Sequence, residues 1–396
     1  MHVVFLVQRF PGYGGAEEYV RELTLRLSDD GVNCTILTSN LDKRNILELP
    51  ESIKVVKLPV LLKIGEYALW KGLLKTLLRS RADVFHVNTY GYFHTDMLSL
   101  ARGLKKFKVV LTGHGFHGLD MFFHLCRNDI KEVSFLMNCR YVSRPFYDFV
   151  LGRNEIKSAD ALVALSQKDV EVYRWLGAEE GKIYEIPQGV RDVFFEDVDK
   201  TNVMSIREQL NGDPIILSVG ELSGIKGKDI PLRALALLVK EYPRARLVYI
   251  GRDGGKCKFL KELVAHYGLK ENVFFLGYVP SDQLINYYNS ADVLVHTSYA
   301  EGLSTIILEA MAAGLPVVST PAGGNAYLLQ NSNAGVVVPF GNATSVFAAV
   351  DKIVKDNQFR VLLALNGRTY ASKNFRWNEI VEKHKELYQH VLGYSD

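Results

Sequence analysis

Short runs of apolar residues alternate with segments of helical periodicity along most of the chain. The runs have the length of buried strands and leave room for a helix between neighbours, which predicts parallel βαβ units. A first set of runs comprises residues 3–7, 33–39, 53–59, 83–88, 108–114, 159–166 and 182–187, and a second set comprises 214–222, 245–254, 272–280, 291–298, 316–320 and 334–339. The pattern therefore predicts an α/β fold with two doubly wound domains.

The boundary between the two predicted domains falls in the polar stretch 192–212, which has no strong strand pattern. We expect one domain over residues 1–195, a second over 196–376, and a final amphipathic helix within 377–396. Ligands of open parallel sheets bind at the carboxyl ends of the strands. Two such domains facing each other would enclose a cleft there, so a site is expected in the loops that follow the strands.

Composition narrows the class of protein. The chain has 396 residues, 23% of them charged, and a net charge of +3, which suits globular domains without a nucleic-acid-binding tail. Its four cysteines lack CxxC spacing, which favours neither a zinc site nor disulfides and indicates a reducing compartment. The start, MHVVFLVQRF, resembles a first strand more than a signal peptide. No apolar run reaches the roughly 18 residues of a membrane span, so we expect a cytoplasmic protein.

Two glycine-rich loops carry candidate phosphate-binding residues. Gly14 and Gly15 precede a predicted helix, where backbone N–H groups can approach a phosphate. This loop lacks the GxGxxG fingerprint and suits a tight turn equally well. Lys226 and Lys228 lie in a glycine-flanked loop of the second half. A lysine there can neutralise a diphosphate, although solvated loop lysines are common.

A histidine follows the strand expected at 108–112, in the sequence TGHGFHG. His114 lies at the carboxyl end of that strand and is a candidate for polar contact with a substrate. His117 is the weaker candidate of the pair. A metal site would need further ligands, and no clear third one is nearby, so no metal is expected.

The segment EGLSTIILEAMAAGLPVVST, at 301–320, places two glutamates in an apolar setting. The helix is expected to begin near Ser304 and Thr305, which are good N-cap types and would leave an anion site at the helix start. Glu309 lies inside this helix, eight residues after Glu301, and a carboxylate on such a core element is unusual. Paired carboxylates beside an anion site suit a ligand with phosphates and many hydroxyls, such as a nucleotide sugar.

With these motifs the chain resembles the retaining glycosyltransferases of family four, which have the GT-B fold of two Rossmann-like domains. The resemblance covers nearly the whole chain and is strongest from about 182 to 340. It rests on the E-x7-E pair with EAMAAGLPVVST, and on KIYEIPQGV, VGELSGIKGKD, LVYIGRDG, FFLGYV, YYNSADVLVHTS and PAGG. The terminal FRWNEIVEKHKELY is similar to the helix that crosses back onto the N-terminal domain in that family.

The resemblance implies a role for each candidate residue. The diphosphate would be held by Lys226 and the backbone at Ser304 and Thr305, with Gly14 and Gly15 closing from the other domain. Glu309 would bind the ribose, Tyr278 would contact the base, and Glu301 and His114 would act at the transferred sugar. Glu221 stands where the family usually has arginine, so one diphosphate contact is missing or is replaced by a residue such as Lys228.

The implied activity is sugar transfer with retention from a nucleotide-diphosphosugar, a UDP- or GDP-sugar, to a hydroxyl acceptor such as a glycolipid, a lipid-linked saccharide or another glycan. A front-face departure needs neither a protein nucleophile nor a further cofactor. Two alternatives stay open: a nucleotide-sugar epimerase of the same fold, and a non-catalytic nucleotide-sugar-binding protein. The sequence does not identify the sugar, base, acceptor or linkage.

The N-terminal half contains a basic segment of mixed character. Residues 57–108 hold ten Lys and Arg against three acids. Within them, 60–81 (VLLKIGEYALWKGLLKTLLRSR) suits a basic amphipathic helix on an anionic membrane at the inner face, or a core-packed helix with a solvated face. The aromatic-rich stretch 116–150 suits an acceptor-side lid, a lipid-facing element or a packed insertion.

Overall fold

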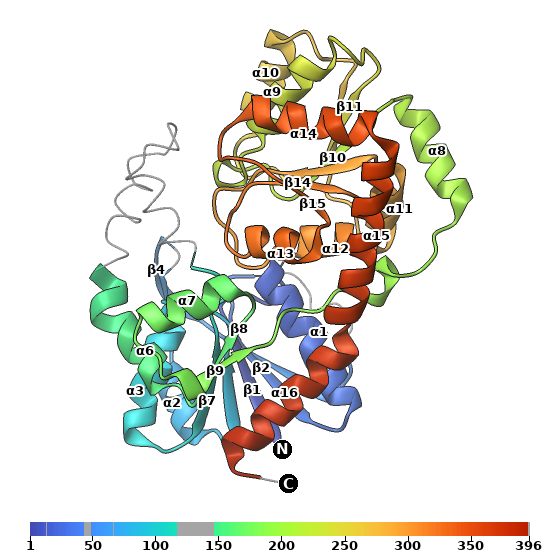
Figure 1. Cartoon of the computed structure of the whole chain (residues 1–396). Helices are drawn as coiled ribbons and strands as arrows, with labels where there is room; N and C mark the ends of the chain where they lie inside the picture. Colours follow the sequence, from blue (N-terminus) through green and yellow to red (C-terminus); the bar gives the residue numbers. More distant parts are fainter. Residues whose placement is uncertain (13, 43–48, 66, 117–145, 395–396) are drawn as a thin grey trace. The chain divides into compact units, whose positions relative to one another are not determined.

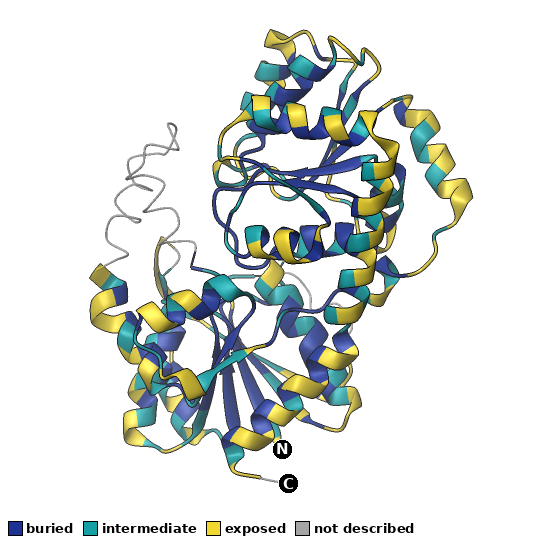
Figure 2. Cartoon of the chain, in the orientation of Figure 1, coloured by how far each residue is buried: buried dark blue, intermediate teal, exposed yellow. Residues whose placement is uncertain are grey.

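The computed structural model describes residues 1–12, 14–42, 49–65, 67–116 and 146–394. The chain divides into two compact units. The first takes residues from 1–116, 142–189 and 377–396, and the second contains 190–376. Figure 1 colours the chain by sequence, and Figure 2 shows that in each unit buried strands are covered by helices whose outer faces are exposed.

The first unit is built on a parallel sheet with the strand order β3-β2-β1-β6-β7-β8-β9. Its central strands consist mostly of apolar residues that are buried on both faces, as expected for a sheet covered by helices. The strands are β1 (His2–Val7), β2 (Asn33–Ser39), β3 (Ile53–Leu58), β6 (Val84–Val87), β7 (Lys108–Thr112), β8 (Ala161–Ala164) and β9 (Ile183–Glu185). The helical elements are α1 (Gly15–Asp29), α2 (Leu73–Arg79), α3 (Phe93–Leu104), η1 (Asp148–Gly152), α6 (Arg153–Ser158), α7 (Gln167–Trp175), η2 (Glu180–Lys182) and α16 (Trp377–Leu392).

The last helix, α16, belongs to the first unit although it follows the second in sequence. Its buried face includes Trp377 and His384 and packs against α1. The Tyr19 hydroxyl on α1 lies 2.6 Å from Nε2 of His384, and Nδ1 of His86 on β6 lies 2.6 Å from the Tyr388 hydroxyl. A buried polar network therefore joins α16 to both α1 and the sheet.

The second unit has a parallel sheet with the strand order β12-β11-β10-β13-β14-β15. The strands are β10 (Ile215–Val219), β11 (Arg246–Ile250), β12 (Val273–Gly277), β13 (Val293–His296), β14 (Val317–Ser319) and β15 (Gly335–Val337). The helical elements are η3 (Asp192–Phe194), α8 (Lys200–Leu210), η4 (Gly224–Lys226), α9 (Asp229–Leu238), α10 (Cys257–His266), α11 (Ser281–Ser290), α12 (Thr305–Ala312), α13 (Asn325–Ser332), α14 (Ala343–Lys355) and α15 (Asn357–Asn374). The predicted α/β class and the two doubly wound sheets are confirmed.

The expectation of one amphipathic helix over 60–81 is wrong. Strands β4 (Val60–Ile64) and β5 (Tyr67–Trp70) form an antiparallel hairpin. The helix α2 begins only after Gly72, whose φ is +76°. The hairpin is held to α3, because the Tyr67 hydroxyl donates to Asp96 and Trp70 stacks on His94 with ring centroids 4.9 Å apart. These partners come from a distant segment, so helical periodicity within 60–81 did not determine the structure.

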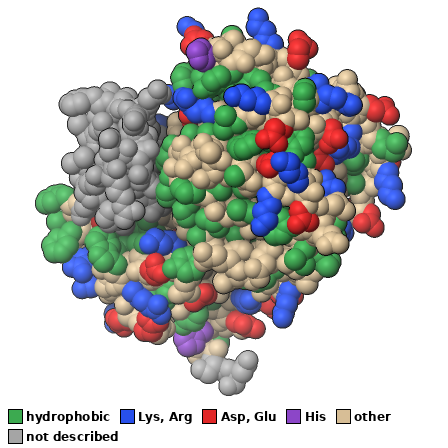
Figure 3. All heavy atoms as spheres, turned by 45° about the horizontal axis from the view of Figure 1, so that its top comes forward, with side chains coloured by type: hydrophobic (Ala, Val, Ile, Leu, Met, Phe, Trp, Pro, Cys, Tyr) green, Lys and Arg blue, Asp and Glu red, His purple; other side chains and the backbone are tan. Residues whose placement is uncertain are grey.

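Among the described residues, no helix is long and apolar enough to cross a membrane. The same residues contain no group of three or more His, Cys, Asp or Glu that could hold a metal ion. On the face seen in Figure 3, Lys and Arg side chains are interspersed with Asp and Glu, in keeping with the small net charge of +3. Most of the aromatic-rich stretch, including His117, lies outside the described residues.

Candidate functional site

The central pair of strands in the second unit marks the expected position of a ligand site. Strands β10 and β13 are neighbours and pair in parallel, yet β11 and β12 lie on one side of them and β14 and β15 on the other. The strand order thus reverses between β10 and β13, and ligands of such sheets bind where the connections from two such strands diverge. Lys226 follows β10 and Glu301 follows β13, so both candidates come from loops at this position.

These two loops are bonded to each other. The Thr297 hydroxyl donates to the carbonyl of Gly227 at 2.9 Å, and the amide of Tyr299 donates to the carbonyl of Ile225 at 2.8 Å. Gly227 has a φ of +55°, and a Cβ placed there would lie 2.3 Å from the Thr297 carbonyl oxygen. Only glycine allows this approach, which holds the Lys226 loop against the loop that carries Glu301.

Glu301 is the centre of a buried polar cluster. Its Oε1 accepts a hydrogen bond from the Lys226 ammonium at 2.7 Å and lies 2.9 Å from Nε2 of His296. Glu301 is 8% exposed and His296 is 1% exposed. Burial lowers the pKa of His296 in spite of the nearby Glu301 carboxylate. The ring is therefore neutral at pH 7, and an Nε2–H tautomer suits the hydrogen bond to Glu301.

A glycine turn after β14 supports the backbone of Glu301. Gly323 has a φ of +54°, and a Cβ there would lie 2.2 Å from the Glu301 carbonyl oxygen. The amide of Gly324 donates to the carbonyl of Gly302 at 2.8 Å. Gly323 of the sequence PAGG therefore lets this turn pack directly on the loop of Glu301.

The N-cap of α12 lies three residues beyond Glu301. Ser304 is the N-cap, as predicted, and its carbonyl accepts from the amides of Ile307 and Leu308. Its hydroxyl makes no cap bond to the helix and lies 3.3 Å from Nε2 of His296. The N–H groups of the first turn, beginning at Thr305, are therefore not capped by the Ser304 hydroxyl, and such a helix start attracts an anion.

Glu309 lies four residues after Thr305 and so shares its face of α12. The carboxylate is partly buried, and its Oε2 accepts from the hydroxyl of Tyr288 on α11 at 2.9 Å. Burial raises the pKa of Tyr288 well above its ordinary value, and Glu309 adds to this effect. The tyrosine therefore stays a donor and holds Glu309 in an otherwise apolar helix.

Tyr278 follows the edge strand β12 and is 54% exposed. The guanidinium of Arg252, which follows β11, lies 4.7 Å from the centre of its ring. The pair gives a flat, cationic surface at the carboxyl end of neighbouring strands. A planar base could stack on such a surface.

The first unit holds the remaining candidates at the ends of β1 and β7. Gly14 is the N-cap of α1 and Gly15 its first residue, and both are exposed. A Cβ on Gly15 would meet nothing within 4 Å, whereas one on Gly14 would lie 2.4 Å from a carboxylate oxygen of Glu17. The expected helix start is therefore present, and Glu17 lies over part of it.

His114 has a φ of +50°, a conformation that residues other than glycine rarely adopt. Its ring lies edge-on to Tyr19 of α1, with centroids 4.8 Å apart, so α1 and the end of β7 meet at this histidine. The preceding Gly113 donates its amide to the Tyr173 hydroxyl at 2.9 Å. Strained residues of this kind concentrate at functional sites.

Two residues of the second unit were not expected from the sequence. His296 and Tyr288 contact Glu301 and Glu309, respectively. His296 ends the apolar run ADVLVH, and its position at the carboxyl end of a strand was the one available signal. Tyr288 lies within a helix, and nothing in the sequence indicated its partner.

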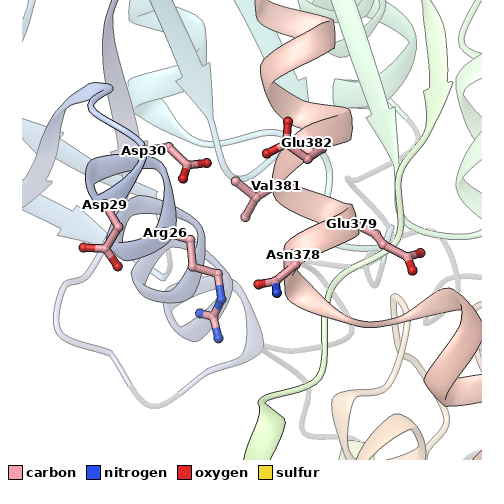
Figure 4. A pocket seen from close by; sticks show the side chains of 7 residues that line it. All are labelled: Arg26, Asp29, Asp30, Asn378, Glu379, Val381 and Glu382. Atoms are coloured by element: carbon pink, nitrogen blue, oxygen red, sulfur yellow. The ribbon is translucent and has the colours of Figure 1, made fainter.

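A depression lined by α1 and α16 of the first unit contains none of the candidate residues (Figure 4). It is lined by Arg26, Asp29, Asp30, Asn378, Glu379, Val381 and Glu382. Lys385 pairs with Asp30 at 3.0 Å and with Glu382 at 2.8 Å, which offsets part of its negative charge. We assign no ligand to it.

Comparison with known proteins yields two family models that together match most of the chain. Residues 13–193 match the model described as Glycosyltransferase Family 4, and residues 199–370 match the model described as Glycosyl transferases group 1. An uncharacterized glycosyltransferase of Methanocaldococcus jannaschii is 25% identical over 97% of this chain and 98% of its own length. A D-inositol 3-phosphate glycosyltransferase of Xylanimonas cellulosilytica is 31% identical over 60% of this chain and 59% of its own length.

A solved structure of the Anabaena protein Alr3699/HepE, in complex with UDP, superposes with a TM-score of 0.78 at 20% identity, covering 98% of this chain and 100% of that one. The Anabaena protein has also been solved with UDP-glucose. The architecture is therefore that of the GT-B glycosyltransferases. The chain belongs to the glycosyltransferases of family 4, also described as glycosyl transferases group 1, and it is an enzyme of the transferase class.

Proposed function

We propose that this glycosyltransferase moves a sugar, with retention of configuration, from a nucleotide-diphosphosugar to a hydroxyl acceptor. The observation that carries the proposal is the buried cluster of Lys226, Glu301 and His296 beside the start of α12. A cation and a helix N-terminus suit a diphosphate. A fixed carboxylate next to them suits the hydroxyls of the attached sugar.

Each site residue then has a role at the donor. Lys226 and the backbone at Ser304 and Thr305 bind the diphosphate, and Glu301 orients the sugar. Glu309, held by Tyr288, binds the ribose hydroxyls. Tyr278 stacks on the base. Gly14, Gly15 and His114 of the first unit have the roles that the resemblance to the family implies for them.

The reaction breaks the bond between the anomeric carbon and the diphosphate oxygen and forms a bond from that carbon to the acceptor oxygen. Negative charge develops on the departing diphosphate, where Lys226 and the α12 dipole stabilise it. A phosphate oxygen takes the proton of the acceptor hydroxyl on the same face of the sugar. Orientation of the sugar by Glu301 supplies much of the remaining rate.

The UDP and UDP-glucose complexes of the Anabaena protein favour a UDP-sugar as donor, and a GDP-sugar is the next candidate. A thermal-shift screen of UDP-, GDP- and ADP-sugars tests this. A ligand at 100 times its dissociation constant adds about 2.7 kcal/mol to the free energy of unfolding. No stabilisation by any sugar nucleotide would contradict the proposal.

Lys226→Ala and Glu309→Ala should each lower donor-dependent transfer at least tenfold, because each removes a charged contact to the donor worth roughly 1.5–3 kcal/mol. Transfer to an acceptor and thermal unfolding are measured together, so that loss of folding is separated from loss of activity. Full activity in both variants would show that the site assignment is wrong. Detection of an epimerised nucleotide sugar as the product would favour the alternative of an epimerase.

For the acceptor side we propose a lipid-linked or glycan hydroxyl and peripheral binding to an anionic, cytoplasm-facing membrane. The hairpin of β4 and β5 exposes Leu61 by 66% and Ile64 by 67%, with Lys63 between them. Apolar side chains beside a cation suit the interface of an anionic bilayer.

Co-sedimentation with anionic vesicles at low salt tests this proposal, with neutral vesicles as the control. Leu61→Asp combined with Ile64→Asp should reduce the bound fraction severalfold, since it removes the apolar contacts and adds negative charge. Absence of binding by the unaltered protein at low salt would exclude a peripheral membrane enzyme of this kind.

A further inference from the structure

Lys228, two residues after Lys226, is a buried lysine. It is 3% exposed. Its Nζ donates to the carbonyl of Val219 at 2.6 Å and to the hydroxyl of Ser218 at 3.0 Å, both on β10. Both partners are neutral, so they satisfy hydrogen bonds without balancing the charge of an ammonium. A buried charge without a counter-ion is costly.

The charged groups around Lys228 do not supply that counter-ion. Within the described part of the chain, no carboxylate forms a salt bridge with it, and Glu301 is already shared by Lys226 and His296. The other charged or titratable groups near Lys228 have partners of their own or are exposed. Asp229 pairs with Arg233 on α9, Glu221 is exposed in the loop after β10, and the Tyr249 hydroxyl of β11 donates to the Lys228 carbonyl. Two lysines therefore share the field of one carboxylate.

The ammonium of Lys228 also lies close to the glycine that packs against the first turn of α12. Gly220, which follows β10, has a φ of +115°, and a Cβ placed on it would lie 3.7 Å from Nζ of Lys228. The same position is 3.2 Å from Cδ1 of Ile306 in the first turn of α12. The buried ammonium and a side chain from the first turn of α12 therefore both lie close to Gly220.

We propose that Lys228 supplies a second positive charge to the donor diphosphate, which serves as the counter-ion that no described residue provides through an ion pair. The proposal rests on the proposed function, because it assigns a further residue to the same donor subsite. Lys226 reaches the phosphates from the partly exposed loop, while Lys228 acts from beneath Gly220.

As a consequence, the Lys228 side chain takes up a proton when the donor binds. Burial, with a smaller contribution from the charge of Lys226, lowers the pKa of Lys228 to about 7, and the opposing effect of Glu301 does not restore it. At pH 8 the side chain is therefore mostly neutral in the free enzyme. A bound diphosphate raises this pKa, so affinity is greatest at low pH and falls as pH rises through 7.

Isothermal titration of the sugar nucleotide that stabilises the enzyme, starting with UDP-glucose, measures this uptake. Titrations at pH 6 and pH 8 are run in buffers of different ionisation enthalpy, and the diphosphodiester has no proton of its own to exchange in this range. We expect about 0.9 protons taken up per donor at pH 8 and about 0.1 at pH 6, with affinity about fivefold weaker at pH 8 than at pH 7.

Three variants test whether Lys228, and not another group, takes up the proton when the donor binds. Lys228→Gln should bind at least fivefold more weakly at pH 6 and take up no proton at pH 8. Lys228→Arg keeps a charge at every pH and should bind without uptake. Lys240→Met, which removes an exposed lysine just beyond α9, should behave like the unaltered enzyme.

Binding without proton uptake by the unaltered enzyme, or uptake that persists in Lys228→Gln, would overturn the role of Lys228 and leave the proposed function intact. Failure of every sugar nucleotide to bind would overturn both.

Discussion

At the scale of single residues, Glu301 connects the groups of the donor-side cluster. One carboxylate oxygen faces both Lys226 and His296, at 2.7 and 2.9 Å. The carboxylate therefore fixes the lysine and is itself fixed by a neutral histidine. Such mutual support keeps a charged group in one orientation before substrate arrives, which is what electrostatic preorganisation requires.

Glu301→Gln should separate the contribution of Glu301 to the sugar from that of Lys226 to the phosphates. Transfer should fall by a factor of about 10–100, because a charged hydrogen bond worth roughly 1.5–3 kcal/mol is lost. Binding of UDP, which lacks the sugar, should be unchanged or tighter, because the variant no longer neutralises Lys226. Rates are measured by product formation and UDP affinity by calorimetry. Parallel loss of UDP binding and transfer would argue against a role at the sugar.

The sequence identified this cluster only in part. Glu301, Lys226 and Ser304 were expected because each stands out against its local pattern. His296 and Tyr288 were missed, because their importance depends on which residues face them from other elements. Local sequence contains no direct record of such contacts, whereas a lone carboxylate among apolar neighbours is visible at once.

At the scale of elements, the turn around Gly323 shows how one loop positions another. Gly323→Ala would place a Cβ 2.2 Å from the backbone oxygen of Glu301, which cannot move without displacing the whole loop. Gly268 provides a matched control, because its φ is +68° and its Cβ would meet nothing within 4 Å.

Gly268→Ala should cost about 1–2 kcal/mol of stability from backbone strain alone and leave activity unchanged. Gly323→Ala should cost more and lower transfer at least tenfold. Chemical denaturation and transfer assays distinguish the two. Equal effects of the two substitutions would mean that strain, rather than contact with the Glu301 loop, accounts for the result.

The elements themselves were largely predictable, since the buried strands and the start of α12 follow from apolar runs and N-cap chemistry. The hairpin of β4 and β5 was not. Its strands, VLLKI and YALW, do not alternate regularly between apolar and polar residues, and the structure is decided by the contacts of Tyr67 and Trp70 with α3. Tertiary contacts of this kind override local periodicity.

At the scale of the whole molecule, buried neutral histidines limit stability in acid. Burial lowers the pKa of His94 to about 3, that of His384 to about 4, and that of His86 well below its ordinary value. All three lie in the first unit. The unfolded chain binds their protons below about pH 6.5 and the folded unit does not, so their contribution to stability is lost as pH falls.

Each such histidine should reduce the free energy of unfolding by about 1.4 kcal/mol per pH unit between pH 6.5 and its folded pKa. Burial raises the pKa of Glu155, so this residue makes the folded unit relatively more stable as pH falls, opposite to the histidines. The test therefore compares the variant with the unaltered protein. His384→Gln should make the free energy of unfolding less dependent on pH, by about 1.4 kcal/mol per pH unit from pH 6 to 4.5. Tryptophan fluorescence during urea unfolding measures it, because Trp70, Trp175 and Trp377 all lie in the first unit. An unchanged slope would contradict the assignment.

The place of α16 in the first unit has a consequence for biosynthesis. The Tyr19 hydroxyl and the rest of the α1 face that α16 covers are made early, but their partners on α16 are made after residues 190–376. At 5–20 residues per second, the α1 face stays without its partner for roughly 20–70 s, until α16 has been made. The second unit can fold as soon as it emerges, whereas the first, although translated earlier, is completed last. Loss of the last 20 residues should therefore harm the first unit more than the one to which they are adjacent in sequence.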